Sequence, residues 1–493
     1  RGAQPGTSPA TVLHRTKTEM RPFGRARANR FAFGRAAHWV GAMPSPTDTI
    51  AALATPAGTS ALAVLRVSGA DTARLARELC GETPPPRRMR RADYRARDGT
   101  LIDDVLVTFF PGPRSYTGED ALEVSCHGNP FIAQKILEDL LARGCRPAGP
   151  GEFTQRAFLN GRMDLSQAEA VMDVIHARSE RALAAAHQQL RGALGRKMNE
   201  LVEALLGVLA RIEAYIDFPD EDLPPEDRSV IAGMLDHILL DTNQLLVTSH
   251  YGELLRDGIK TVIVGAPNVG KSSLLNRLVG RERALVSAEP GTTRDFIEER
   301  LIVGPHGLRL IDTAGLNPAP AELEKRGMDM AMERAEEADL FLLVVDATQP
   351  PPALPPALLS LLRSRSSLVV VNKTDLADGA PLMPDLAGLQ AVRVSALTGA
   401  GWETLISAIV SRADLFQQDI GNESIAINAR HTSALGAAKS CLGAARKTLE
   451  QQGPVELLAS DLRGALEAFG EIAGKIDHER VLDQLFATFC IGK

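Results

Sequence analysis

KTVIVGAPNVGKSSLLNRLVG, residues 260–280, decides the fold of the middle of the chain. An apolar strand leads into a glycine-containing loop and then a helix, and the loop matches G-x-x-x-x-G-K-[ST] through Gly265, Gly270, Lys271 and Ser272. Backbone N–H groups of such a loop surround phosphate oxygens, the lysine reaches the β- and γ-phosphates, and the serine hydroxyl binds Mg²⁺. We therefore expect a nucleoside triphosphate site, because the strand–loop–helix context disfavours a chance glycine-rich turn.

Two segments that follow this loop in the sequence fit the triphosphate end of the ligand. LRLIDTAGL (308–316) is a strand that ends in Asp312, which can hold Mg²⁺ through water, and the glycine of DTAG lets a backbone N–H approach the γ-phosphate. SAEPGTTRD (287–295) offers Thr292 or Thr293 to close over the γ-phosphate and complete the Mg²⁺ shell. This second segment is a plausible nucleotide switch.

Two further motifs fit a guanine base. LVVVNKTDL (368–376) is a strand that ends in NKTD, and its carboxylate Asp375 can accept hydrogen bonds from N1–H and the 2-amino group of guanine. Adenine lacks that donor pair. RVSALTGAG (393–401) places three residues behind the base, Ser395, Ala396 and Leu397. Each motif is weak alone, but four in this order, each after an apolar strand, favour GTP over ATP-specific or structural interpretations.

The pattern of apolar residues changes on both sides of this α/β unit. Residues 50–147 read as short strands and turns with one amphipathic helix, PFIAQKILEDLLARG, which favours an α+β domain. In residues 165–215 and 229–256 the apolar residues recur at helical spacing, and the same pattern returns after about residue 416. We infer that the α/β unit is inserted between two halves of one helical domain.

The combined motifs resemble the tRNA-modification GTPase family MnmE/TrmE. GAPNVGKSSLLN, PGTTRD, DTAGL and NKTD carry the nucleotide part, and three other segments name the family: SYTGEDALEVSCHGNP, PGEFTQRAFLNGRMDLSQAEA and the terminal CIGK. The resemblance covers residues 48–493. It implies a multidomain α+β and α/β protein: an N-terminal α+β folate-binding domain, a discontinuous all-helical domain, and an inserted Ras-like P-loop GTPase domain whose parallel-rich sheet has helices on both faces.

The resemblance also implies domains, cofactors and partners. We expect an extension over 1–47, the folate-binding and dimerisation domain over 48–160, the first helical half over 161–256, the G domain over 257–415, and the second helical half with the CIGK tail over 416–493. The implied cofactors are GTP, Mg²⁺, K⁺ and a 5-formyl- or methylene-tetrahydrofolate. The implied partners are a second copy of the chain, the FAD protein MnmG in a heterotetramer, and tRNA, whose wobble uridine receives a carboxymethylaminomethyl- or aminomethyl-type group.

Position 316 departs from many GTPases, which place there a glutamine that orients the attacking water. Leu316 cannot hydrogen-bond to water, and the family match gives that role to Glu324. Without the family resemblance, Glu324 is interpreted as one of several solvent-exposed charged residues of a helix. Asn268 resembles the residue that offers its side-chain oxygen to K⁺, with the backbone of three others completing the site, Ser287, Glu289 and Thr292. Asn268 as a simple turn former is the alternative.

For folate, the family match falls on Arg66, Glu123, Arg162 and Lys493. A carboxylate suits the N–H edge of a pterin, and cations suit the glutamate tail. The family usually has lysine at 162, so the charge is kept but the geometry changes. Cys490 near the C-terminus is a candidate reactive, catalytic thiol, or else a buried structural one.

The expected ligand residues form two sets. The cofactor-binding set is Arg66, Glu123, Arg162, Asn268, Val269, Gly270, Lys271, Ser272, Ser273, Ser287, Ala288, Glu289, Pro290, Gly291, Thr292, Thr293, Asp312, Thr313, Ala314, Gly315, Asn372, Lys373, Asp375, Ser395, Ala396, Leu397 and Lys493. The metal set, for Mg²⁺ and K⁺ together, is Asn268, Ser272, Ser287, Glu289, Thr292 and Thr293.

Composition limits the other possibilities. The 493 residues are 44% hydrophobic, 24% charged and 4% aromatic, with a net charge of −6, which disfavours purely electrostatic nucleic-acid binding and stacking on single strands. We find no apolar run near the roughly 18 residues that span a membrane, and expect no membrane partner. The five cysteines form no CxxC pair, which favours a reducing compartment.

The first 43 residues are rich in arginine and nearly free of acids. They read either as an organellar transit peptide, which implies a mitochondrial protein, or as translated upstream sequence with Met43 as the start. The second interpretation is favoured, because a cleaner strand pattern begins just after Met43, and a cytoplasmic location is then expected.

Two other functions compete with tRNA modification by a GTPase. A ribosome-assembly GTPase of the Era/Der type shares the nucleotide motifs, but such proteins usually append a basic RNA-binding module after the G domain, and residues after 415 show none. A nucleotide-gated assembly scaffold is the third possibility. Recovery of MnmG and tRNA, of ribosomal subunits, or of the chain alone would distinguish the three.

Overall fold

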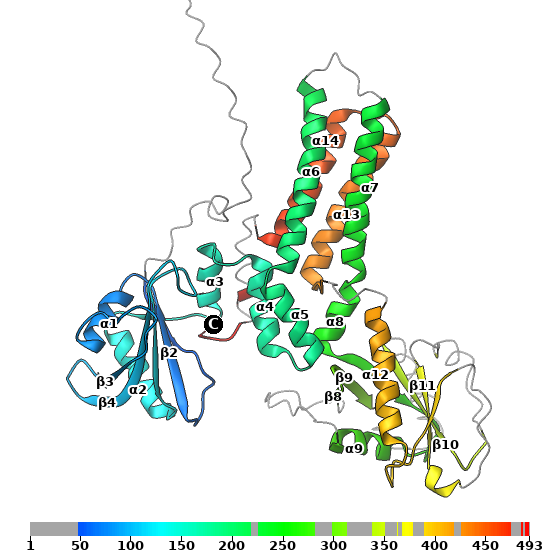
Figure 1. Cartoon of the computed structure of the whole chain (residues 1–493), viewed down its shortest axis with the longest axis horizontal. Helices are drawn as coiled ribbons and strands as arrows, with labels where there is room; N and C mark the ends of the chain where they lie inside the picture. The colour runs from blue at the N-terminus through cyan, green and yellow to red at the C-terminus, as the bar shows by residue number, and fades with distance from the viewer. Residues whose placement is uncertain are drawn as a thin grey trace, which may run out of the picture. The chain divides into compact units, whose positions relative to one another are not determined.

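The computed structural model describes residues 48–217, 225–281, 298–312, 338–350, 362, 367–377, 389–418, 425–474, 485–486 and 489–492. These residues form two sheets with their covering helices and a set of long helices (Figure 1). The expected fold class, α+β and α/β with a discontinuous helical part, is confirmed.

The first sheet has the strand order β3-β4-β5-β2-β1-β6, antiparallel except for the β1–β6 pair. Its elements are β1 (Ile50–Leu53), β2 (Leu62–Ser68), α1 (Thr72–Cys80), β3 (Arg90–Arg95), β4 (Leu101–Phe110), β5 (Ala121–His127), α2 (Pro130–Ala142), β6 (Arg146–Pro147) and α3 (Glu152–Leu159). Leu75 of α1 and Ile136 of α2 enter one core with Leu65 and Val124 of the strands. The alternating apolar residues of β2 and β5 therefore face the helices, and the residues between them face away.

The second sheet has the order β12-β11-β10-β7-β9-β8, and only β8 is antiparallel to its neighbour. Its elements are β7 (Ile259–Val264), α9 (Lys271–Arg281), β8 (Glu298–Val303), β9 (His306–Asp312), β10 (Leu340–Asp346), β11 (Ser367–Asn372), the 3₁₀ helix η2 (Thr374–Leu376), β12 (Ala391–Arg393) and α12 (Trp402–Gln418). Strands β10 and β11 are buried along their whole length, as runs of Val and Leu in a parallel sheet require. The parallel strands end at one edge, so the loops after β7, β10 and β11 lie together.

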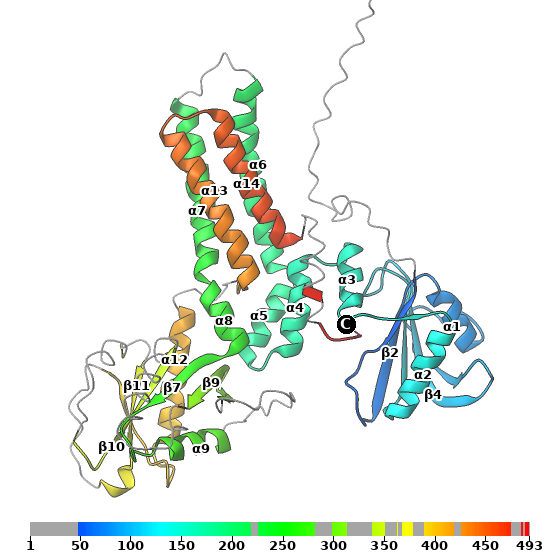
Figure 2. The ribbon, with the colours of Figure 1, turned by 180° about the vertical axis from the view of Figure 1, so that it is seen from behind.

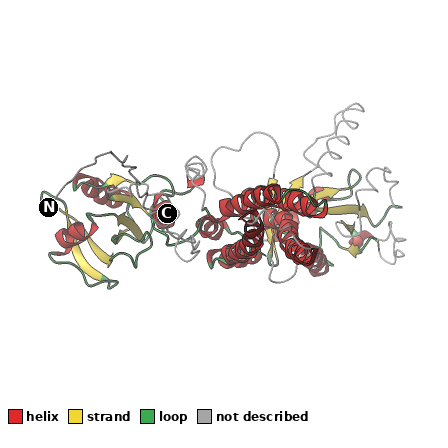
Figure 3. Ribbon diagram, turned by 90° about the horizontal axis from the view of Figure 1, so that it is seen from above, coloured by secondary structure: helices red, strands yellow, loops and turns green. Residues whose placement is uncertain are grey.

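The long helices come from both sides of this sheet in the sequence. They are α4 (Leu165–His176), α5 (Glu180–Leu190), α6 (Ala193–Asp217), α7 (Pro225–Val247), α8 (Ser249–Asp257), α13 (Ala429–Glu450) and α14 (Val455–Ala473). The packed pairs α6–α7, α6–α14, α7–α13 and α13–α14 form a four-helix arrangement (Figures 2 and 3). The insertion of the second sheet between two halves of a helical unit is thus observed directly.

A buried charged cluster joins the two halves of the helical unit. Glu169 of α4 accepts hydrogen bonds from Arg430 and lies 2.8 Å from His431 Nε2, both of α13. Burial alone would raise the pKa of Glu169, but the hydrogen bonds from His431 and Arg430 outweigh it and lower that pKa to about 2. Burial lowers the pKa of His431, although the carboxylate opposes the shift.

One helical stretch, Asp227–Asp257, is long and apolar enough to cross a membrane by length and composition alone. The sequence analysis did not identify it. The stretch comprises most of α7 together with α8, and α7 packs against α6 and α13. Because a helix that packs in a bundle passes the same test, it is weak evidence for a membrane span.

Candidate functional site

The loop between β7 and α9 has a backbone that requires glycine at two positions. Gly265 has a φ of 156° and Gly270 a φ of 97°. A Cβ at position 265 would lie 2.3 Å from the Val344 carbonyl oxygen, and one at position 270 would lie 2.2 Å from Asn372 Nδ2. The close approach of the loop to β10 and β11 therefore explains both glycines of the sequence motif.

Lys271, the first residue of α9, adds an ammonium group to the end of the helix where the helix dipole is positive. That ammonium donates to the carbonyl oxygens of Gly265 at 2.9 Å and Ala266 at 2.8 Å. Ser272 and Ser273 are exposed at the same helix end. Donors, a cation and free hydroxyls in one place fit a polyphosphate and its Mg²⁺.

Asn372, the first residue of NKTD, joins three of the predicted motifs. Its Nδ2 donates to the Val269 carbonyl oxygen of the phosphate loop at 2.9 Å. Its Oδ1 accepts from the backbone N–H of Ala396 at 2.9 Å. The phosphate loop and the segment expected behind the base are therefore both fixed to the end of β11.

The expected base-binding residues differ in exposure. Asp375 is exposed on η2, where a ligand can reach it. Ser395 is fully buried, and its Oγ accepts from the N–H of Thr398 at 3.0 Å. Leu397 is 82% exposed. Ser395 and Ala396 thus shape the loop, whereas Asp375 and Leu397 are open to a ligand.

The sequence analysis missed Arg277 of α9. Its Nη1 donates to the carbonyl oxygens of Ala396 at 2.8 Å and Leu397 at 2.9 Å. Its guanidinium lies 5.6 Å from the ring centroid of Trp402 in α12. The side chain therefore fixes the base-backing segment to the phosphate-loop helix, a contact that no local sequence pattern reveals.

Several predicted residues lie outside the described part of the chain. Asp312 ends β9, and its backbone pairs with Ile263 of β7. The residues of which nothing further is described are Ser287, Ala288, Glu289, Pro290, Gly291, Thr292, Thr293, Thr313, Ala314, Gly315, Leu316, Glu324 and Lys493. Their roles stay predictions.

The structure pairs two of the four residues predicted for folate. Arg66 of β2 and Glu123 of β5 are cross-strand neighbours, and Arg66 Nη2 lies 2.8 Å from Glu123 Oε1. The guanidinium lies 5.4 Å from the ring centroid of Tyr116 and 5.7 Å from that of Phe153. Its Nη1 donates to the carbonyl oxygen of Gly492 at 3.3 Å. A cation, a carboxylate and two aromatic rings thus gather on the sheet face away from α1 and α2.

The C-terminal tail reaches the same place (Figure 1). Ile491 forms a bridge with Pro150, and the Gly151 N–H donates to the Cys490 carbonyl oxygen at 3.3 Å. Cys490 is exposed, so the alternative of a buried structural thiol is wrong. Arg162 is exposed just after α3.

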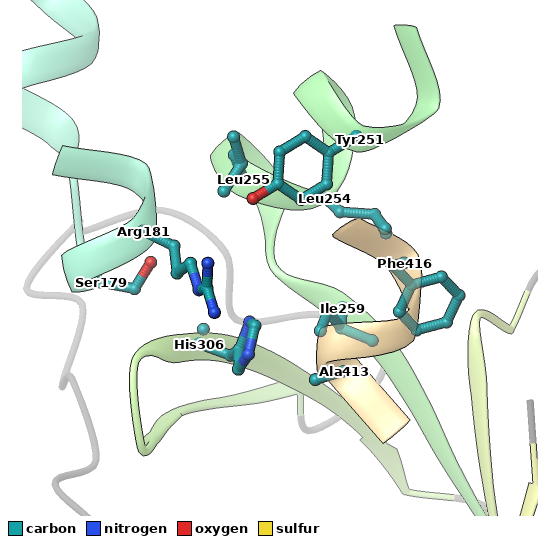
Figure 4. Close-up of a pocket in the computed structure, with 10 residues that line it drawn as sticks. Ser179, Arg181, Tyr251, Leu254, Leu255, Ile259, His306, Ala413 and Phe416 are labelled. Carbon is teal, nitrogen blue, oxygen red and sulfur yellow. The ribbon is translucent and has the colours of Figure 1, made fainter. Parts of the chain in front are cut away.

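A small pocket lies among α5, α8, β7, β9 and α12, and none of the predicted ligand residues lines it (Figure 4). Figure 4 shows Arg181 and His306 side by side at its wall. Both contact one carboxylate oxygen of Asp414, at 2.8 and 2.9 Å. Burial lowers the pKa of His306, although Asp414 opposes the shift. The shared carboxylate therefore connects α5, β9 and α12.

Two models of known protein families together match nearly all of the described chain. A family model described as the GTP-binding protein TrmE N-terminus matches residues 49–162, and one described as the MnmE helical domain matches residues 165–490. The chain is 30% identical to the G domain of the T. maritima FeoB iron transporter, over 31% of this chain and 98% of that one, with a TM-score of 0.24.

Full-length relatives carry the same description. The chain is 61% identical to a tRNA modification GTPase MnmE of Opitutus terrae, over 92% of this chain and 100% of the relative. It is 44% identical to the Akkermansia muciniphila protein of the same name, again over 92% and 100%. With the phosphate loop, the guanine motif and the tail at the first sheet in place, the chain belongs to the MnmE family of tRNA modification GTPases.

Proposed function

We propose that this GTPase is activated by K⁺ and acts with the FAD protein MnmG to modify the wobble uridine of tRNA, with a reduced folate as one-carbon donor. The observation that carries the proposal is Asn372, whose side chain joins the phosphate loop to the segment behind the base. A site built this way holds a guanine nucleotide in one register. GTP hydrolysis in tRNA modification follows from membership of the family.

The chain's own groups account for nucleotide recognition. Lys271 and the N–H groups at the start of α9 bind the β- and γ-phosphates, and Ser272 and Thr293 would hold Mg²⁺. Asp375 accepts from the guanine N1–H and 2-amino group, so a base without those donors leaves a carboxylate unpaired. When bound, the two cations supply positive charge beside the phosphates.

The proposed K⁺ dependence rests on two positions. Asn268 is exposed in the phosphate loop with a φ of 63°, so its side chain is available as an oxygen ligand. Leu316 cannot orient water, and we assign that role to Glu324 as in the family. Ser287, Glu289 and Thr292 would complete the K⁺ site when their segment closes over GTP.

The proposed folate site is the face around Arg66. The guanidinium lies between two aromatic rings and a carboxylate, a surface that suits a flat heterocycle with N–H donors. The contact between Arg66 and Gly492 brings the tail, with Cys490, near that face, and Lys493 is the next residue in the sequence. We propose that Arg162 and Lys493 meet the glutamate end of the folate, and that Cys490 takes part in the chemistry.

We further propose a homodimer that assembles through the first-sheet domain, as in the family, and a complex with MnmG and tRNA in the cytoplasm. The domain boundaries at 48, 161, 257 and 416 belong to the same proposal.

The proposal is tested in a bacterial strain that lacks its own MnmE. Expression of this chain should restore the modified wobble nucleoside, measured by mass spectrometry of total tRNA, and the Lys271→Ala variant should not. Recovery of MnmG and tRNA with the tagged chain should accompany restoration. Equal amounts of soluble chain without the modified nucleoside, or recovery of ribosomal subunits instead, would contradict the proposal.

A further inference from the structure

Lys373 of the guanine motif has two acceptors in addition to any ligand. It has a positive φ of 62°, which few residues other than glycine adopt. Its ammonium donates to the backbone oxygen of Asn268 and to Asp346 Oδ2, both at 2.7 Å. The lysine therefore bridges the phosphate loop and the end of β10.

The contact to Asn268 controls the direction of a phosphate-binding donor. A trans peptide points its C=O and its N–H in opposite directions, so holding the Asn268 oxygen also fixes the Val269 N–H. Asn372 holds the Val269 oxygen in the same way, which fixes the Gly270 N–H. Two neighbouring side chains, Asn372 at the end of β11 and Lys373 just after it, thus orient two successive N–H groups of the loop.

Asp346 is fixed by the fold before any nucleotide binds. It is the last residue of β10, in register with Asn372 of β11, and its side chain is 2% exposed. Its Oδ1 accepts from the N–H of Thr348 at 2.9 Å and from the Thr348 hydroxyl at 2.7 Å. Burial alone would raise the pKa of Asp346, but the hydrogen bonds from Lys373 and Thr348 leave that pKa below its ordinary value. The carboxylate is therefore charged near neutral pH.

We propose that Asp346 is a positioning residue of the nucleotide site, which acts through Lys373 to preorganise the phosphate loop. Without this carboxylate, the ammonium keeps only the Asn268 oxygen and the solvent as partners, and the loop spends less time in its binding conformation. The consequence is faster release of both GDP and GTP, with the preference for guanine unchanged because Asp375 is untouched. The inference rests on the proposed function only in taking the ligand as a guanine nucleotide.

The test is the release rate of fluorescent GDP from the full chain, measured in Na⁺ buffer by stopped flow. Asp346→Asn keeps the shape and should speed release about 10- to 100-fold, the range expected for one hydrogen bond to a charged group. Asp339→Asn is the matched control, because Asp339 precedes the same strand and accepts the Lys260 N–H. It should change release by less than about 3-fold.

A double-mutant cycle separates positioning from general damage. In a Lys373→Met background, Asp346→Asn should add little, because its effect passes through the lysine. If the two changes multiply, or if Asp346→Asn alone releases GDP at the wild-type rate, the inference is wrong. Thr348→Val, at an exposed residue, supplies a second variant if Asp346→Asn does not fold, and should give an intermediate rate that also depends on Lys373. Failure of the wild-type chain to bind GDP would contradict the proposed function instead.

Discussion

Replacing Gly270 by alanine tests how closely the phosphate loop depends on the strands beneath it. The new Cβ would lie 2.2 Å from Asn372 Nδ2, so the amide must move and give up its bonds to the Val269 oxygen and the Ala396 N–H. Each lost hydrogen bond costs about 1 kcal/mol, and the φ of 97° adds about 1–2 kcal/mol for a residue with a Cβ. The sum is about 3–4 kcal/mol.

In the free variant the loop can relax and relieve this strain. Nucleotide binding requires the original loop conformation, so the cost of the strain falls on the bound state. We therefore expect GDP affinity to fall by about 100- to 1000-fold, since 1.4 kcal/mol is tenfold. Calorimetric titration with GDP measures the effect, and thermal unfolding verifies that the variant is folded. Gly280→Ala in the same helix is the control, because a Cβ added there would meet no atom of the described residues within 4 Å beyond its chain neighbours and the backbone of its own helix, and it should bind like wild type. GDP binding by Gly270→Ala within about 3-fold of wild type would refute the reasoning.

Four further substitutions test other parts of the protein. Asp375→Asn should weaken GTP binding and gain xanthosine triphosphate in a competition assay, because the carboxylate that accepts from guanine is lost; an unchanged GTP preference would contradict this. Arg66→Ala and Glu123→Ala should each weaken 5-formyltetrahydrofolate binding at least tenfold by calorimetry, whereas wild-type affinity in both would exclude the site. Glu169→Gln should lower the free energy of unfolding at pH 7 by about 3 kcal/mol, since it removes the carboxylate partner of the buried His431 and of the half-buried Arg430. Folding lowers the pKa of Glu169 from its ordinary 4.5 to about 2, so the stabilisation by its carboxylate is complete above about pH 5 and is lost as the pH falls toward 2. Urea unfolding at a series of pH values should therefore show a smaller decrease in the free energy of unfolding between pH 5 and pH 2 for Glu169→Gln than for wild type.

The strand–loop–helix segment and the strand before NKTD could be predicted from the sequence because the signals for them are local. The strand, loop and helix of residues 260–280 are continuous, and NKTD follows a strand that is buried along its whole length. Apolar runs between turns predict the short strands and the helix α2 of residues 50–147, and helical spacing predicts the helices of residues 165–215, 229–256 and those after about 416. These elements could be predicted without knowledge of the order of the strands in the sheets.

Other features depend on contacts between distant residues, which periodicity does not show. Strand β3 reads RRADYR, and only Tyr94 in it is fully buried, so this edge strand lacks an apolar alternation. Helix α1 was also not identified. Arg277 and Asp346 lie outside the recognised motifs, and their contacts depend on which strands and helices become neighbours. The pairing of Arg66 with Glu123 likewise follows from the register of β2 on β5.

K⁺ activation is tested by the rate of GTP hydrolysis in K⁺ compared with that in Na⁺. We expect fast turnover in K⁺ and slow turnover in Na⁺, because the smaller Na⁺ ion fits the same oxygen ligands poorly. Asn268→Ala should blunt this difference and weaken pairing of G domains, whereas Glu324→Ala should pair normally but lose turnover by a factor on the order of 10² or more. Equal rates in K⁺ and Na⁺, measured on intact nucleotide-bound protein, would show that K⁺ does not activate this GTPase.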